Sequence, residues 1–497
     1  MDVLPTSSTA TSVAPPPVIV PSCLQARQLS VQAFLPPEPD RPTVNSVLRR
    51  YAPRYLERYP ERVSNHERHV LQRLLHCRQP EMGSHPWHCD WCGHTHISYN
   101  GCDNRHCANC RGARRGEWLE EVMSWSLPIR YLHVIVTLPH ELSPLMLANR
   151  AVLYRLFLKS CSEAVMYVAL RQYGARVGLI MFLHTWGQPM LHHVHSHQVV
   201  SAGGLSRDGT RWIEIPAEDH ALDEDQLSAR FRKRFLLGLW KLYYKQQLVF
   251  PAEMSGIRSA EEFYFWIEPI MEKRWHTYCQ GPPADCPSGS GVLKYLARYV
   301  VGSAINDQRI LSDDGQHVTI RAKDYYTDQV GPLTLTGEEF VHRYLLHILP
   351  PRVQRVRYRG LYTSRHREKT LSHCRKLLGV ADESLATESD QTAEDPFDPD
   401  EAEGDDAERS PTCPRCLMPG MRSLGRHSQQ ETYRLLERLT LFWQSVTTLL
   451  LVLSLPTSAG SQGSPLTPSI DVVVGSMTTL GIDITTGHHS HLPRPDT

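Results

Sequence analysis

The stretch MLHHVHSHQVVSAGG, from Met190 to Gly204, holds a dense run of histidines and decides how the middle of the chain folds. We expect it to form an extended strand, in which residues two apart lie on the same face. Two sets of side chains then project in opposite directions: His193, His195 and His197 on one face, and His192, Val194 and Ser196 on the other. Neutral imidazoles at this spacing can bind one divalent ion such as Mn²⁺. By itself, such a pattern is more often an ordinary surface or core group of histidines.

A second pattern, further along the chain, favours a metal site over an ordinary group of histidines. GVLKYLARYV, residues 291–300, predicts a helix in which Tyr295 and Tyr299 have i, i+4 spacing. Both hydroxyls then lie on one helical face. Two tyrosines on a helix are common in protein cores, but a His-x-His strand together with a paired-tyrosine helix is much rarer. The combination favours a catalytic site.

Apolar runs on either side of the histidine stretch predict further elements. YLHVIVTLP (131–139) and GLIMFLHTW (178–186) are typical of buried strands, whereas 143–174 predicts one long amphipathic helix that begins at Ser143. Strands that alternate with helices after a cysteine module predict an α+β fold with an N-terminal zinc-binding appendage.

The cysteine module carries two C-x-x-C pairs, Cys89 with Cys92 and Cys107 with Cys110, with the segment 93–106 between them. This spacing predicts one structural Zn²⁺ site, because each pair offers two thiolates to a tetrahedral ion and leaves no open position. Other side chains nearby leave a second ion or a different ligand set open: Cys77, Cys102, His94, His96 and His106.

A third C-x-x-C pair, Cys413 with Cys416, forms only half a site and needs other ligands, such as His427, or none. The segment 1–21 lacks the basic and apolar regions of a signal peptide. Cysteines clustered in this way favour reduced thiolates in the cytoplasm over a disulfide framework.

The charge of the chain is unevenly distributed. The formal net charge is zero, but 13 acidic residues and no Lys or Arg lie between Asp382 and Glu408, which leaves 40 acidic against 53 basic residues elsewhere. This excess suits a polyanionic partner. The apolar run from Leu439 to Pro456 is interrupted by polar residues and barely reaches the ~20 residues of a membrane span, so we expect no membrane partner.

These patterns divide the chain into five parts. We expect a disordered N-terminus, a helical and zinc-binding domain, an α+β domain, an acidic linker and a poorly defined tail with half a zinc knuckle, over residues 1–42, 43–125, 131–376, 382–409 and 410–497.

Six segments resemble one known family. They are CDNRHCANC (102–110), VTLPHEL (136–142), HVHSHQVVSAGGLSRDG (193–209), YLARY (295–299), LTLTGEEFVHRYLLHILP (333–350) and RVRYRGLY (355–362). In this order they resemble the two-tyrosine HUH transposases of rolling-circle insertion sequences, of the insertion-sequence-ninety-one type, over about residues 48–376. The resemblance implies an HUH endonuclease-type antiparallel sheet flanked by helices, with a helical and zinc-ribbon-like module at the N-terminus.

The resemblance places the metal-binding pair on His195 and His197, which would hold Mg²⁺ or Mn²⁺, and leaves the third ligand unassigned. Tyr295 and Tyr299 would be the catalytic nucleophiles of a metal-dependent DNA endonuclease and strand transferase. Such an enzyme nicks and rejoins single-stranded DNA at element ends and target through 5′-phosphotyrosine intermediates. The order of attack, the DNA sequence and the oligomeric state are not assigned.

Basic residues near two of these motifs are candidate DNA contacts. They are Arg105 and Arg111 beside the cysteines, and Arg352, Arg355, Arg357 and Arg359 in RVQRVRYRGLYTSRHREK. Arginines would follow the phosphates while Tyr358 and Tyr362 stack on bases. A solvated basic strand is the alternative for any single residue.

Three other functions stay open. The family usually has a hydrophobic residue where Ser196 stands, and Pro where Val194 stands, so an inactive copy that acts only as a zinc-dependent DNA-binding protein is one alternative. A plasmid-type rolling-circle replication initiator is the second. The third is a hydrolase with catalytic zinc at His195 and no need for either tyrosine.

Overall fold

The computed structural model describes residues 41–282, 303–324, 327, 329–380 and 411–454. The predicted nucleophiles Tyr295 and Tyr299 and the acidic linker lie outside the described residues, as does the N-terminus up to residue 40. The chain divides into two compact units, residues 1–437 and 438–497. The first unit contains the sheets and candidate sites, and residues 438–454 of the second are helical. None of the described helices has the length and apolarity needed to cross a bilayer.

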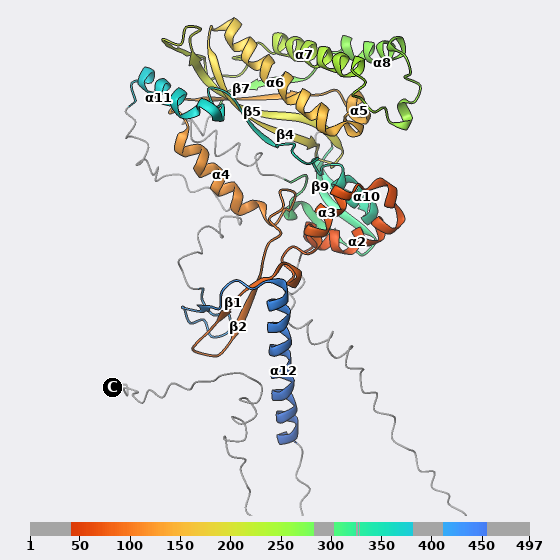
Figure 1. Cartoon of the computed structure of the whole chain (residues 1–497), viewed down its shortest axis with the longest axis vertical. Coiled ribbons are helices and arrows are strands. Elements are labelled where there is room, and N and C mark those ends of the chain that lie inside the picture. Colours follow the sequence, from red (N-terminus) through yellow and green to blue (C-terminus); the bar gives the residue numbers. More distant parts are fainter. Residues whose placement is uncertain (1–40, 283–302, 325–326, 328, 381–410, 455–497) are drawn as a thin grey trace, which may run out of the picture. The chain divides into compact units, whose positions relative to one another are not determined.

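A central antiparallel sheet carries the histidine stretch (Figure 1). Its strands run in the order β11-β4-β5-β3-β7, and β6 pairs with the far end of β5. In chain order the strands are β3 (Tyr131–Thr137), β4 (Arg176–Trp186), β5 (His192–Leu205), β6 (Trp212–Glu214), β7 (Thr277–Gln280) and β11 (Val356–Gly360). Strand β5 lies between β4 and β3, so the histidines stand in the middle of the sheet.

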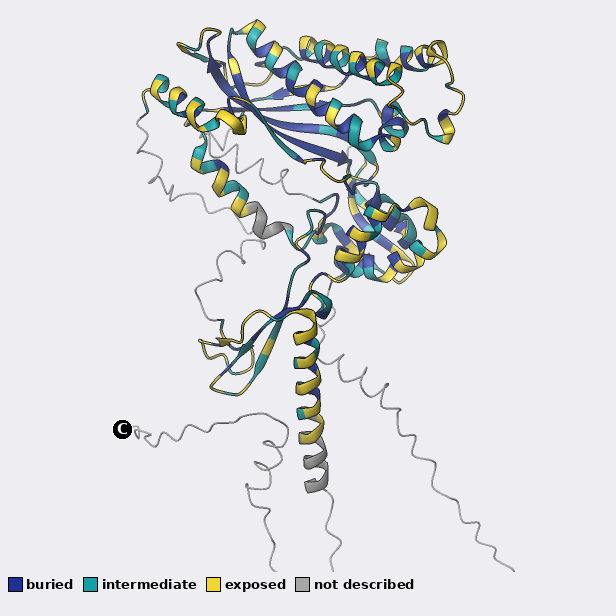
Figure 2. Cartoon of the chain, in the orientation of Figure 1, coloured by how far each residue is buried: buried dark blue, intermediate teal, exposed yellow. Residues whose placement is uncertain are grey.

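Helices cover both faces of this sheet, whose strands are largely buried (Figure 2). The helices are α4 (Arg111–Trp125), α5 (Ser143–Ala148), α6 (Arg150–Gln172), α7 (Glu224–Tyr244), α8 (Ala260–Glu272) and α11 (Arg367–Leu378). Alternate strand residues such as Val134 and Leu179 pack with α6, α7 and α8 in the larger core, whereas Ile180 and Val199 pack with α4 and α11 on the opposite face. The α+β class, with an antiparallel sheet flanked by helices, is confirmed.

The predicted long helix over 143–174 is interrupted at Asn149, between α5 and α6. The Asn149 amide donates to the carbonyls of Leu145 and Val249, and its oxygen accepts from the Val249 backbone N–H. A side chain that bonds to a distant loop in this way competes with a continuous helix. The single-helix prediction is therefore wrong at this position.

The N-terminal helices pack with a segment that is distant in sequence. These helices are α2 (Val44–Arg58) and α3 (Asn65–Leu75), and their partners are β8 (Ile310–Asp313), β9 (His317–Lys323), β10 (Val330–Thr336) and α10 (Gly337–Leu345). The three strands form a separate antiparallel sheet. Capping boxes at Thr43 and Ser64 begin the two N-terminal helices. The predicted continuous domain 131–376 is thus interrupted, because the residues around 305–348 share their core with 44–77.

A third small sheet combines two strands from the N-terminal region with one from the C-terminal region. It has the order β12-β1-β2, from β1 (Ser84–His88), β2 (Thr95–Tyr99) and β12 (Arg422–Ser423), and α12 (Gln429–Ser454) follows. Short 3₁₀ helices connect elements elsewhere: η1 (Pro60–Arg62), η2 (Pro80–Met82), η3 (His140–Leu142), η4 (Ala252–Met254), η5 (Asp307–Arg309) and η6 (Ser364–His366).

Candidate metal centres

Three histidines from two neighbouring strands converge in the central sheet. His184 on β4 lies directly opposite His195 on β5, and His197 follows two positions along the same strand. One ring nitrogen from each lies within 4.8 Å of the others. The structure therefore brings His195 and His197 together and adds His184 as a third candidate ligand. The sequence could not identify His184, because only the register of β4 against β5 places it there.

Hydrogen bonds orient two of these rings. His133 on β3 lies with its Nε2 2.9 Å from Nδ1 of His197, and the two rings are stacked at a centroid distance of 5.1 Å. His195 donates from Nδ1 to the backbone carbonyl of His193, at 3.2 Å. In both rings Nδ1 is engaged, which leaves Nε2 for an ion. Such outer partners fix ring orientation in metal sites.

Burial keeps these imidazoles neutral, as metal ligands must be. It lowers the pKa of His195 to about 4, with a further contribution from the charge of His193. For His197, burial followed by the charges of His184 and His195 holds the pKa well below its ordinary value. Neutral imidazoles with free lone pairs are the form that binds divalent ions. The residues present therefore fit a divalent metal.

An aromatic side chain borders the three histidines. Trp186 stacks on His184 with ring centroids 4.6 Å apart and planes 19° from parallel. The Arg355 guanidinium lies over the Trp186 ring, 5.3 Å from its centroid, and Arg355 is only 7% exposed. The structure thus places Arg355, a predicted DNA contact, as a buried side chain that packs on the Trp186 ring.

The opposite face of β5 buries polar side chains. Ser196 is fully buried, and its Oγ lies 3.5 Å from the carbonyl of His197. Gln198 is fully buried as well, and neither its amide nitrogen nor its amide oxygen has a hydrogen-bond partner among the described residues. These two positions face an apolar core, so they cost the strand stability.

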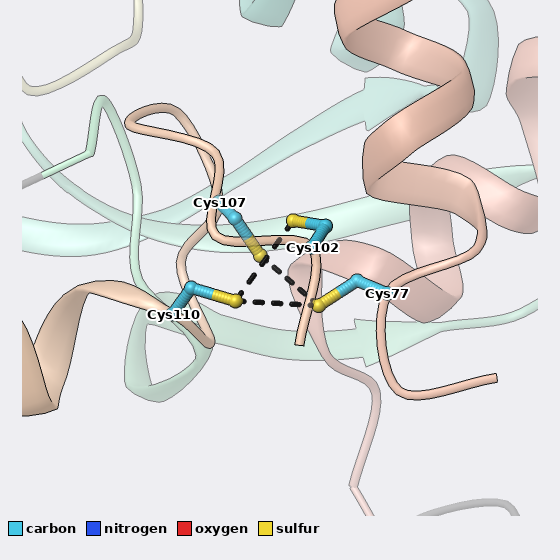
Figure 3. A group of neighbouring side chains, drawn as sticks. All are labelled: Cys77, Cys102, Cys107 and Cys110. Carbon is cyan, nitrogen blue, oxygen red and sulfur yellow. Dashed lines mark hydrogen bonds between the residues drawn. The ribbon is translucent and has the colours of Figure 1, made fainter. Parts of the chain in front are cut away.

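A first cysteine cluster lies beside the N-terminal helices and contains Cys77, Cys102, Cys107 and Cys110 (Figure 3). The Cys77 sulfur lies 3.5 Å from those of Cys107 and Cys110, and the Cys102 and Cys110 sulfurs are 3.8 Å apart. Zn–S bonds of about 2.3 Å place tetrahedral sulfurs roughly 3.8 Å apart. The cluster therefore fits a closed zinc site.

A second cluster contains Cys89, Cys92, Cys413 and Cys416. The prediction of one site from Cys89, Cys92, Cys107 and Cys110 is thus corrected: the two pairs belong to different clusters. The reason is the hairpin β1–β2, which carries Cys89 and Cys92 at its tip and Cys102 beyond its base. A strand of about five residues spans about 17 Å, too far for one ion. His427, proposed as a partner of the C-terminal pair, is in neither cluster.

Arg105, predicted to contact DNA, holds the chain together instead. Its guanidinium donates to the backbone carbonyls of Leu349, Pro350 and Val353, and its Nε donates to His106. Burial lowers the pKa of Arg105. With these donors engaged, the side chain fastens residues 349–353 to the cysteine loop.

The other predicted DNA contacts lie in different surroundings. Arg352 is exposed, whereas Arg357 and Arg359 are half-buried on β11. Burial, followed by the charges of Arg359 and Arg155, lowers the pKa of Arg357. Arg155, Arg357 and Arg359 therefore form a positively charged group. The side chain of Arg111 lies outside the described residues.

Of the two tyrosines predicted to stack on bases, Tyr362 is excluded by its burial, whereas Tyr358 is half-buried. Tyr362 is fully buried in the core beneath α4 and α11. The Tyr358 hydroxyl accepts a hydrogen bond from Trp118 Nε1 at 2.9 Å, and its ring packs edge-on against Trp125. Both rings serve packing within the protein.

The chain is similar in sequence to known transposases. A family profile described as "Putative transposase" matches residues 178–370, and one described as "Transposase zinc-binding domain" matches residues 47–138. "Putative transposase y4qJ" of Sinorhizobium fredii is 35% identical over 343 residues, which cover 68% of this chain and 85% of the relative. "Transposase for insertion sequence element IS801" of Pseudomonas savastanoi pv. phaseolicola is 26% identical over 300 residues, 60% of this chain and 70% of the relative. No solved structure matches.

Proposed function

Because this chain belongs to the transposases of the insertion-sequence-ninety-one type, with an N-terminal zinc-binding domain, we propose how it acts on its DNA substrate. It nicks and rejoins single-stranded DNA at the ends of its element through 5′-phosphotyrosine intermediates. The observation that carries this proposal is the convergence of His184, His195 and His197 on one point in the sheet.

The histidines and tyrosines have separate tasks in this proposal. His184, His195 and His197 would hold a Mg²⁺ or Mn²⁺ ion, which would supply Lewis-acid polarisation of the scissile phosphate. A tyrosine phenol has a pKa near ~10 and is a weak nucleophile at neutral pH, so it needs such an activated target. Trp186 and His133 keep the ligand rings in place.

The reaction exchanges one phosphodiester for another, so the bond energy is retained in the link to tyrosine. The phenol oxygen of Tyr295 or Tyr299 loses its proton and attacks phosphorus to form the phosphotyrosine bond. The bond from phosphorus to the 3′ oxygen breaks, and that oxygen takes up a proton to leave as a 3′-OH. A 3′-OH from a second strand then attacks the phosphotyrosine, restores the phenol and completes strand transfer without ATP. Two tyrosines allow the enzyme to hold one strand while it cuts another.

Other parts of the chain support this role. The zinc ion of the zinc-binding domain has a structural role, because four thiolates leave no open position on the ion. We propose that Arg352, Arg357 and Arg359 contact the phosphate backbone of the substrate. The cysteine residues that the structure describes are free thiols, which suits zinc binding in the reducing cytoplasm.

A second candidate function is DNA binding without cleavage. Two features of β5 favour it: Ser196 is buried, and the Gln198 amide has no partner among the described residues. Both weaken the strand that carries two of the ligands. The comparisons support neither the replication initiator nor the zinc hydrolase.

A covalent-adduct assay tests the proposal. The full chain is incubated with labelled single-stranded DNA from its element ends and Mn²⁺, and label that migrates with denatured protein is measured. We expect an adduct that requires metal and is lost in the Tyr295→Phe, Tyr299→Phe double variant and in His184→Ala. The exposed Tyr244 supplies the control variant, Tyr244→Phe, which should keep full activity.

The single tyrosine variants rank the two hydroxyls. An adduct that persists in the double variant would refute the nucleophile assignment. If no adduct forms on a strand that the protein binds, DNA binding without cleavage is the correct function.

A further inference from the structure

The two halves of the second cysteine cluster have the same local geometry. At the tip of the β1–β2 hairpin, the Cys89 N–H donates to the carbonyl of His94 and the Gly93 N–H donates to the carbonyl of Cys89. Each of these bonds is 2.9 Å long. Gly93, which directly follows the cysteine pair, has a left-handed φ of 67°. A turn with this pattern holds the cysteine pair in a fixed orientation.

The C-terminal pair repeats this turn bond for bond. The Cys413 N–H donates to the carbonyl of Met418, and the Leu417 N–H donates to the carbonyl of Cys413, again at 2.9 Å each. Leu417 adopts a φ of 60°, although a non-glycine residue rarely takes a left-handed conformation. The strain at Leu417 indicates that the surrounding structure imposes this turn.

The two turns face each other with their sulfurs at metal-site spacing. The Cys89 and Cys416 sulfurs are 3.6 Å apart, and those of Cys92 and Cys413 are 3.7 Å apart. A disulfide would need about 2.05 Å. Tetrahedral sulfurs around zinc are roughly 3.8 Å apart. The spacing therefore fits a shared ion.

The C-terminal segment is also fastened to the hairpin by backbone pairing. Strand β12 adds to β1, with Trp87 opposite Ser423, and His427 and Ser84 exchange two backbone hydrogen bonds. The buried Ser84 hydroxyl lies 2.8 Å from that of Thr432. These contacts therefore hold the C-terminal segment against the hairpin that carries the other two cysteines.

We propose that Cys89, Cys92, Cys413 and Cys416 bind a second structural zinc ion, distinct from the one expected at Cys77, Cys102, Cys107 and Cys110. Half of its ligands lie outside the matched zinc-binding domain, which ends at residue 138. The ion joins two turns that lie far apart in the sequence and cross-links the chain segments that form the sheet β12-β1-β2. It acts as a clasp between the N-terminal hairpin and the segment that follows the acidic linker.

Zinc stoichiometry tests the site directly. The full chain is expressed with zinc, dialysed, and its metal content measured by mass spectrometry. All proteins in this test carry His195→Ala and His197→Ala, so that the histidine site does not add an ion. In this background we expect two ions per chain with the cysteines intact and one in the Cys413→Ser, Cys416→Ser double variant. The matched control is Cys374→Ser, a buried cysteine on α11 outside both clusters, which should keep two ions.

Cobalt substitution keeps the test informative if a serine variant fails to fold. Wild-type chain freed of zinc should bind two equivalents of Co²⁺ with the visible absorption of tetrahedral thiolate sites. One equivalent in the wild type, or two zinc ions in the Cys413→Ser, Cys416→Ser variant, would overturn the proposal.

A cleavage experiment tests the clasp. A protease site is placed within residues 390–400 of the full chain, and the cut protein is passed over a sizing column. We expect the C-terminal fragment to elute with the rest of the chain when zinc is bound. It should separate in the Cys413→Ser, Cys416→Ser variant, which keeps the first ion. Release of the fragment from zinc-loaded wild type would contradict the clasp.

Discussion

His133 shows how a single side chain outside the ligand set can govern a metal site. Its Nε2 lies 2.9 Å from Nδ1 of His197, so the other nitrogen of the His197 ring is the one that would face an ion. His133→Phe keeps a flat buried ring but removes this bond. Loss of such a partner typically lowers metal affinity about 10–100-fold. We expect a drop of this size in Mn²⁺ affinity, measured by calorimetry.

The exposed His140 provides the control, since its side chain is 84% exposed. His140→Phe should bind Mn²⁺ as the wild type does. Equal Mn²⁺ affinities of His133→Phe and the wild type would show that His133 does not position His197.

Gln198 carries a second prediction at this scale. Its buried amide has no partner among the described residues, and such a group costs about 1–3 kcal/mol. Gln198→Leu should therefore raise the free energy of unfolding by about 1–3 kcal/mol in urea denaturation. The exposed Gln247 gives the control, because Gln247→Leu should change it by less than about 0.5 kcal/mol. A destabilised Gln198→Leu protein would mean that the amide has a partner.

His347 makes stability depend on pH. It is buried between Thr185, whose hydroxyl lies 3.2 Å from Nδ1, and the Met190 carbonyl, 2.9 Å from Nε2. Burial lowers the pKa of His347 from 6.5 to about 4. Between these values the unfolded state binds more protons, so the free energy of unfolding falls as pH falls from 6.5 to 4, by up to roughly 3 kcal/mol.

His347→Gln cannot be protonated in this range, so its stability should fall less steeply over the same pH interval. Urea denaturation at several pH values measures both slopes. Parallel curves for His347→Gln and the wild type would show that another group causes the pH dependence.

At the scale of elements, strand identity was easier to predict than strand pairing. Apolar runs placed β3 and β4 correctly, and alternation placed His195 and His197 on one face of β5. The register of β4 against β5, which brings in His184, depends on contacts between strands that no single run of residues contains. Similarly, the spacing of cysteines identified the ligands but paired them wrongly, because a hairpin lies between Cys92 and Cys102.

The loop over residues 349–353 distinguishes a structural arginine from a binding one. Arg105→Gln removes a charge that donates to three carbonyls of this loop, so the free energy of unfolding should fall by about 3 kcal/mol. Arg352 is exposed on the same loop, so Arg352→Gln should leave stability nearly unchanged and weaken binding to single-stranded DNA. The slope of log affinity against log salt should fall by about one for Arg352→Gln.

Fluorescence anisotropy at several salt concentrations and urea denaturation separate these effects. A lower salt slope in Arg105→Gln, with unchanged stability, would reverse the two assignments.

At the scale of the whole molecule, residues from distant parts of the sequence share cores. Helices α2 and α3 pack with β8–β10 and α10, a pairing that local patterns could not predict because most of the central sheet lies between the partners in sequence. Phe340→Ala should therefore open the core at α10 and speed hydrogen exchange of amides in residues 44–75, with a stability loss of about 3–5 kcal/mol.

The matched control is Phe231→Ala, which empties an equally buried position beneath the central sheet. It should speed exchange in α6 and α7 and leave residues 44–75 protected. Equal effects of both variants on residues 44–75 would show that the two cores unfold as one unit.

The packing of α2 and α3 against α10 has a consequence for synthesis on the ribosome. The apolar faces of α2 and α3 emerge early, but their partner residues, up to Ile348, are complete only after the whole segment 76–347 has been translated. At about 5–20 residues per second this interval lasts on the order of 15–50 s. Throughout it α2 and α3 can pack on each other but lack their partners from residues 305–348, so the N-terminal core is completed only after most of the transposase has been translated.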